Sequence, residues 1–158
     1  MATIPITKSD MIASGLRMDT NLPDAVFANA IQEGAIFHAK ALLGEAHFIE
    51  ALSFEGAILN GGEVDDPKGN TRFIAGFKTT LVYFAYVSLL RHNIVATSFG
   101  SVQKQDEYST NVNPMEQIKY FETIARQFLR EAAECKGWRL QNGGYFTTTA
   151  PTGKGVTK

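Results

Sequence analysis

The sequence predicts an all-α fold: a small helical bundle with one long central helix, a short β-like or irregular segment near residues 96–112, and an extended C-terminal tail. Three observations support this prediction. Apolar residues recur at intervals of three and four along several stretches, which is the period of an amphipathic helix. Residues 81–90 are apolar apart from one serine, and polar segments rich in glycine separate the helical stretches. We therefore expect a helical domain over residues 1–140 and a docking tail over residues 141–158.

The composition limits the class of protein. The 158 residues are 44% hydrophobic and 20% charged, as is typical of a single globular domain. The formal net charge of −1 argues against a whole-protein electrostatic grip on nucleic acid or an anionic membrane, although a local basic segment can still bind. Cys135 is the only cysteine, which excludes a disulfide framework and a cysteine-rich zinc site. The longest apolar run is half of the roughly 20 residues that span a bilayer, so we expect a soluble, cytosol-made protein.

Two helices are expected near the N-terminus. Thr7 can cap a short helix over residues 8–16. Asn21 or Asp24 can cap a second helix of roughly 20 residues, which Gly44 ends. The second helix carries one apolar stripe, made of Val26, Phe27, Ala30, Ile31, Phe37, Ala41 and Leu42.

The middle of the chain contains the predicted central helix. Residues 45–53 read as a further helical piece, and residues 53–70 as a polar surface loop in which a short hairpin is an alternative. Asn70 is then expected to cap a long helix over residues 71–95, whose segment 81–90 is apolar nearly all round. Such a helix lies in the middle of a bundle or is covered by a neighbouring subunit. In the helical piece over residues 45–53, the apolar side comprises Phe48, Ile49 and Leu52.

Residues 96–113 do not have a helical composition, and we expect two short β segments or an ordered loop there. An isolated short hairpin is only marginally stable in water, so the apolar side chains of this connection need a partner surface. We therefore predict that this segment forms a subunit interface through Phe99, Val102 and Tyr108.

The last helix has the clearest boundaries in the sequence. Asn113 is a capping residue, Pro114 occupies the first helical position, and Glu116 completes a capping-box arrangement. Gly137 is expected to end the helix. Its apolar stripe comprises Ile118, Phe121, Ile124, Ala125, Phe128, Leu129 and Ala132.

The C-terminal segment, residues 141–158, contains no acidic residue and cannot fold alone. Two consecutive glycines provide a hinge, and three consecutive threonines favour extended structure over helix. We predict that this tail binds a partner by adding a strand to a sheet edge or by lying in a groove, and the alternative is a disordered end without function. The predicted partner-binding residues are Tyr145, Phe146, Thr148, Lys154 and Lys158.

No catalytic or metal-binding constellation is expected. A carboxylate-bridged metal site needs Glu-x-x-His pairs from two helices, whereas His47 and Glu50 form one pair in the reversed order, with His38 nearby. Cys135 lies beside a lysine that could lower its pKa, but no histidine base is implied, so a structural thiol is expected. Residues 35–52, with a turn at Gly44, are the candidate for a helix-turn-helix. We reject it because a helix that faces DNA needs arginine or lysine to hold phosphates, and Lys40 is the only basic residue in this segment. We expect no enzyme, no cofactor and no sequence-specific binding of nucleic acid.

The layout of residues 8–140 resembles the head–tail connector proteins of tailed bacteriophages, also called adaptor or ring proteins. The resemblance rests on the order of its elements. These are Leu22-Pro23-Asp24 opening an amphipathic helix that ends Ala41-Leu42-Leu43-Gly44, the buried helix over residues 77–91, the irregular residues 97–104, and the capped helix over residues 114–137.

This resemblance implies a virion protein at the head–tail junction, assembled in the cytoplasm of the host cell. Its partners would be other copies in a dodecameric ring, the portal protein, and other ring or tail proteins, with genomic DNA able to pass through the ring and no membrane involved. The competing hypothesis is a small helical ligand-binding or regulatory module that acts as a monomer or dimer. In that case Tyr83, Phe84 and Tyr86 would line a pocket.

Overall fold

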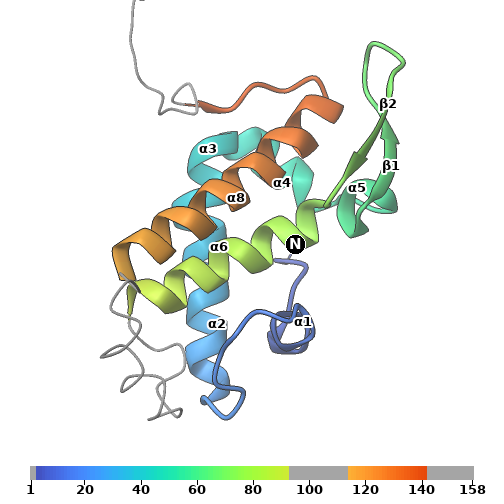
Figure 1. The fold of residues 1–158 in the computed structure, drawn as a ribbon. Coiled ribbons are helices and arrows are strands. Elements are labelled where there is room, and N and C mark those ends of the chain that lie inside the picture. The colour runs from blue at the N-terminus through green and yellow to red at the C-terminus, as the bar shows by residue number, and fades with distance from the viewer. Residues whose placement is uncertain (1–2, 93–113, 142–158) are drawn as a thin grey trace, which may run out of the picture.

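The computed structural model describes residues 3–92 and 114–141, which form a bundle of helices with a two-stranded antiparallel sheet at one end (Figure 1). The prediction of an all-α fold is therefore wrong, because the chain combines helices with a β-hairpin. No helix in these residues is long and apolar enough to cross a membrane. The elements are α1 (Lys8–Ala13), α2 (Asp24–Glu33), the π-helix η1 (Gly34–Lys40), α3 (Ala41–Leu43), α4 (Glu45–Ala51), α5 (Ala57–Asn60), β1 (Gly62–Asp65), β2 (Thr71–Ile74), α6 (Phe77–Arg91) and α8 (Pro114–Cys135).

The hairpin occupies residues that the sequence assigned to a loop and to the start of the long helix. Gly62 pairs with Ile74 and Asp65 pairs with Thr71. Ile74 is buried whereas Phe73 is 81% exposed, so the strand period of two decides the conformation here. The predicted capping role of Asn70 is wrong as well, since this residue closes the hairpin turn by donating its backbone amide to Asp66.

Two glycines meet where the hairpin joins the helices. A Cβ atom on Gly76 would lie 2.4 Å from the backbone nitrogen of Gly61, and one on Gly61 would lie 2.6 Å from the carbonyl oxygen of Ala75. Both glycines have positive φ angles, which residues with side chains rarely adopt. This close contact ends β2 and lets α6 begin only at Phe77.

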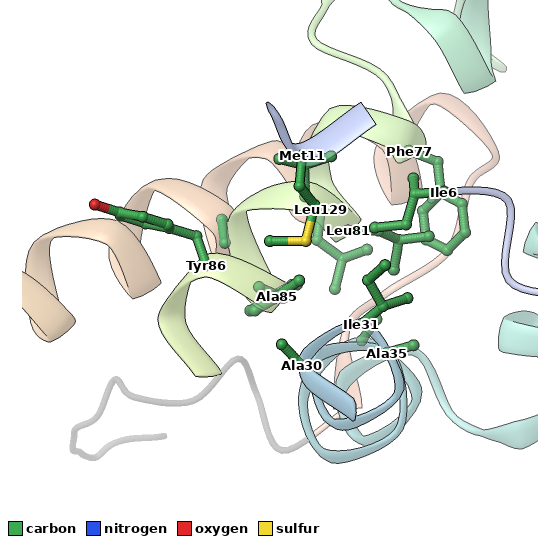
Figure 2. Packing of buried hydrophobic residues seen from close by; sticks show 14 of the residues in the cluster. Ile6, Met11, Ala30, Ile31, Ala35, Phe77, Leu81, Ala85, Tyr86 and Leu129 are labelled. Atoms are coloured by element: carbon green, nitrogen blue, oxygen red, sulfur yellow. The ribbon is translucent and has the colours of Figure 1, made fainter. Parts of the chain in front are cut away.

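The helix α6 is the centre of the bundle, as the sequence predicted. Its side chains are buried on all sides, because it packs against α2 and η1 on one side and against α8 on another. Figure 2 shows Ala85 of α6 facing Ala30 of α2, with Leu81 beside Ile31. A helix without a polar face can only be stable in such a position.

The second predicted helix is interrupted by a π-helix, which the apolar spacing did not indicate. Its wider turn changes which side chains face the core. Ala35 and Ala39 are buried against the bundle, whereas Phe37, expected in the stripe, is 67% exposed. In the neighbouring helix α4, Ile49 was also predicted on the apolar side, but its side chain is 54% exposed.

The helix α8 agrees with its prediction in length and in the face that it buries. Ala125, Leu129 and Ala132 are buried, and Phe121 packs edge-to-face against Tyr86 of α6 with ring centroids 5.0 Å apart. Gly137 adopts a φ angle of 76° after the helix ends. The predicted cap, Asn113, lies outside the described residues.

Candidate functional site

A groove of about 810 Å³ lies between the hairpin turn and the C-terminal end of α8. Its lining combines basic side chains with a small apolar wall, and the chain leaves α8 along its floor. The residues that line it are Asp66, Pro67, Lys68, Arg72, Arg130, Ala133, Glu134, Gly137, Trp138, Arg139 and Leu140.

Local geometry places the hairpin turn against α8. The carboxylate of Asp66 accepts hydrogen bonds of 2.9 Å from the backbone amides of Lys68 and Asn70, which shapes the turn. Arg72 donates a hydrogen bond of 2.9 Å to Glu134 and so ties the hairpin to α8. Two strands alone are marginally stable. The contact between Arg72 and Glu134 therefore helps to hold the hairpin turn at a fixed distance from α8, and this distance sets the width of the groove.

The groove has a surplus of positive charge. The hydrogen bond to Glu134 raises the pKa of Arg72, and the amide of Asn70 lowers the pKa of Asp66, so both groups are charged at neutral pH. Within residues 3–92 and 114–141, no carboxylate pairs with Lys68, Arg130 or Arg139, and Arg130 donates only to the side chain of Gln127. Three cations therefore remain available to carboxylates or other anions.

The aromatic wall of the groove is held in place from behind. Trp138 stacks on His47 of α4, with ring centroids 4.2 Å apart and an interplanar angle of 7°. It also stacks on Phe54, with centroids 5.7 Å apart. Trp138 is the only tryptophan of the chain, so its fluorescence reports on this groove alone.

A second cluster of charges joins α6, η1 and α8 at the other end of the bundle. Glu122 accepts hydrogen bonds of 3.1 Å from Arg91 and 3.0 Å from Arg126. His38 Nδ1 lies 3.7 Å from Glu122, and its ring stacks on Phe84 with centroids 5.2 Å apart. Burial lowers the pKa of His38, so the neutral imidazole is favoured in the folded protein.

Glu33 extends this cluster to α2. It accepts a hydrogen bond from Ser88, and His92 Nε2 lies 3.0 Å from the same carboxylate oxygen. The contact with Ser88 lowers the pKa of Glu33. Together these ionic contacts hold the C-terminal end of α6 against α2 and against the first half of α8.

The residues weighed for catalysis have other surroundings. His38 and His47 contact different partners, and Glu50 Oε2 lies 4.0 Å from Lys136 Nζ. In the described part of the chain, no three His, Cys, Asp or Glu side chains are grouped as metal ligands. Cys135 is buried, and burial raises the pKa of its thiol, so the lowering that the neighbouring lysine could produce is outweighed.

The three aromatic residues of the ligand-binding alternative have packing roles. Phe84 is buried, Tyr86 donates a hydrogen bond of 2.7 Å to the carbonyl of Arg17, and Tyr83 packs edge-to-face on Phe128. None of them lines the groove at α8 or the second described cavity, which lies beside α2.

The predicted interface and tail residues lie outside the described residues. They are Phe99, Val102, Tyr108, Tyr145, Phe146, Thr148, Lys154 and Lys158. The sequence pattern did not indicate Phe73 or the cations of the groove as site residues. Lys68, Arg130 and Arg139 are too far apart in the sequence to form a local pattern.

Comparison with known proteins gives one match. The model of a family of unknown function, DUF6712, matches residues 39–158, which include the hairpin, α6, α8 and the whole groove. The chain matches no curated protein and no solved structure.

Proposed function

We propose that this chain, which belongs to the DUF6712 family because the family match spans more than half of its length, is a structural virion protein. It forms a ring at the head–tail junction of a tailed bacteriophage, docks on the portal and links the portal to the tail. The order of its helical elements, which resembles that of head–tail connectors, motivates the proposal. In this role the chain needs neither catalytic residues nor a cofactor.

The observation that carries the proposal is the exposed hairpin. Figure 1 shows β1 and β2 extending away from the helices, beyond the N-terminal end of α6. Phe73 is 81% exposed there, and each strand has one edge without a strand partner in the described residues. Open edges and an exposed aromatic ring are features that proteins normally cover, and covering a phenylalanine side chain contributes about 1.5–3 kcal/mol. A neighbouring subunit or the portal would provide that cover.

The ionic cluster around Glu122 and Glu33 gives further support. It holds the C-terminal end of α6 against the first half of α8, and the sequence joins these two helices through residues 93–113. A segment that contacts a neighbour needs a fixed base, because ordering a loose loop on binding reduces affinity. The proposed interface residues Phe99, Val102 and Tyr108 belong to this segment, and the proposed portal-docking residues belong to the tail over residues 141–158.

The proposal is tested by assembly with the portal protein of the same phage. The purified full-length chain is mixed with portal, and native mass spectrometry and electron microscopy count the copies bound. We expect a dodecameric ring that matches the portal symmetry. A chain that stays monomeric or dimeric with portal present would contradict the proposal and favour the regulatory-module alternative.

A variant of the hairpin sharpens this test. Phe73→Ser should reduce assembly while leaving the melting temperature nearly unchanged, because the side chain is exposed in the isolated subunit. Thr71→Ser is the matched control on the same face of the same strand, and it keeps the hydroxyl that donates to Asp65. Equal assembly by both variants would show that the hairpin is not the contact.

A further inference from the structure

We propose that the basic groove at the C-terminal end of α8 binds the acidic segment Gln105-Asp106-Glu107-Tyr108 of a neighbouring copy of this chain. This inference rests on the proposed ring function and deepens it, since it names both halves of one contact between subunits. The groove is built from described residues, and its occupant is a named segment of the same sequence.

Charge selects an acidic occupant. Lys68, Arg130 and Arg139 line the groove without a carboxylate partner in the described residues. The chain's own tail over residues 141–158 carries two lysines and no acid, so it does not complement the groove from which it starts. Carboxylates held by arginine form charge-assisted hydrogen bonds, which are the stronger class of polar contact.

The wall of the groove favours a peptide over a nucleic acid. Pro67, Trp138 and Leu140 offer an apolar surface beside the cations, on which an aromatic side chain such as Tyr108 can pack. The carboxylates of Asp106 and Glu107 can pair with the cations of the groove, and the ring of Tyr108 can pack on its apolar wall.

Chain length favours a segment supplied by another copy. The 22 residues of α8 span about 33 Å, and Trp138 and Arg139 lie past its C-terminal end. Glu107 is joined to Pro114 at the opposite end of α8 by seven residues, which reach at most about 25 Å when fully extended. Because α8 is longer than this reach, the segment could contact the far wall of its own groove only through a fully extended chain, and the entropic cost of ordering such a chain favours a segment supplied by another copy.

This contact is compatible with a ring. The acidic segment precedes α8 in the sequence whereas the groove lies at the C-terminal end of α8, so each subunit gives one surface and receives a different one, and such head-to-tail contacts form a ring when the rotation between subunits closes. Two exposed acids close to the groove would give another result. Glu50 lies 4.0 Å from Lys136 and Asp65 directly precedes the groove residue Asp66, so contacts through them would pair two grooves and stop at a dimer.

Fluorescence of Trp138 tests the site directly in the full-length protein. A synthetic peptide of residues 103–110 is titrated into dilute protein, and we expect a saturable change in the emission. The response should weaken at least about tenfold in Arg130→Glu/Arg139→Glu, because two attractive contacts become repulsive. It should also weaken with a peptide carrying Asp106→Lys and Glu107→Lys.

Controls decide between the possible readings. Lys119→Glu reverses one charge at an exposed position of α8 outside the groove, and it should bind the peptide like wild type, whereas each single reversal, Arg130→Glu or Arg139→Glu, should weaken binding. No response in the wild-type protein would overturn the inference, as would a response unchanged in the groove variant. A response to a DNA oligonucleotide or to inorganic phosphate without one to the peptide would overturn it too.

Assembly on the portal separates this inference from the proposed function. Asp106→Lys/Glu107→Lys should fail to form the ring, and combining these changes with Arg130→Glu/Arg139→Glu should restore it by reversing both charges. Normal assembly of either double variant would overturn the groove contact and leave the ring proposal intact. Failure of the wild-type chain to assemble would reject the ring, whereas the peptide titration would still report on the groove.

Discussion

Replacing Gly34 with alanine gives a sharp test of the packing between η1 and α6. Gly34 has an ordinary helical φ angle of −61°, so alanine introduces no backbone strain there. Helix propensity alone predicts a gain of about 1 kcal/mol from this change. The structure predicts the opposite sign, because the new Cβ atom would meet the backbone of another helix.

The magnitude follows from the distances. The Cβ atom would lie 2.7 Å from the backbone nitrogen of Ala85 and 2.8 Å from the carbonyl carbon of Phe84, whereas ordinary contacts begin at 3.4 Å. Both neighbours are backbone atoms in the middle of the central helix, so the clash cannot be relieved by a side-chain rotation. Overpacking of this kind costs about 1–3 kcal/mol, and we expect the upper end, which leaves a net loss of about 2 kcal/mol after the propensity gain.

Thermal and urea denaturation measure this loss. For a chain of this size, about 2 kcal/mol corresponds to a decrease in melting temperature of about 4–8 °C. Asn29→Ala is the matched control, since it raises helix propensity at an exposed position of α2 without a new contact. If Gly34→Ala melts at or above the wild-type temperature, as the control should, the close contact between η1 and α6 does not exist.

Three further predictions concern the last helix, the ionic cluster and the tail. Leu129→Ala should lower the free energy of unfolding by about 2–5 kcal/mol through a buried cavity, whereas Asn113→Ala should cost about 1 kcal/mol through a lost cap; equal small effects in thermal melts would refute this. The free energy of unfolding should decrease as the pH falls below about 6.5, because His38 takes up a proton in the unfolded chain but resists it when buried in the folded protein. Urea midpoints measured above and below this pH should therefore differ less in His38→Gln than in the wild-type protein. Deleting residues 144–158 should leave the melting temperature nearly unchanged but abolish co-assembly with portal in a pull-down, and unimpaired binding would assign docking to the helical body.

The sequence by itself determined the elements whose signal is long and periodic. Residues 81–90 are apolar on every side, so they had to lie at the centre of the bundle, and α6 does. The stripe that contains Ala125 and Leu129 predicted the buried face of α8, because many residues repeat the same spacing and each adds to the same free energy of burial. Thr7 likewise stands at the start of α1, where its backbone amide donates a hydrogen bond of 2.8 Å to the carboxylate of Asp10.

Only the tertiary structure decided the hairpin, the π-helix and the groove. The four residues of β2 are too few for periodicity to distinguish strand from helix, and their conformation depends on pairing with β1 and on the contact of Arg72 with Glu134, 62 positions away. The π-helix begins at Gly34, which packs closely on the backbone of α6, and Phe37 within it lies at the surface. The groove joins Lys68 to Arg130 and Arg139 for the same reason: contacts between residues distant in sequence leave no local pattern, because their free energy is gained only once the helices have packed.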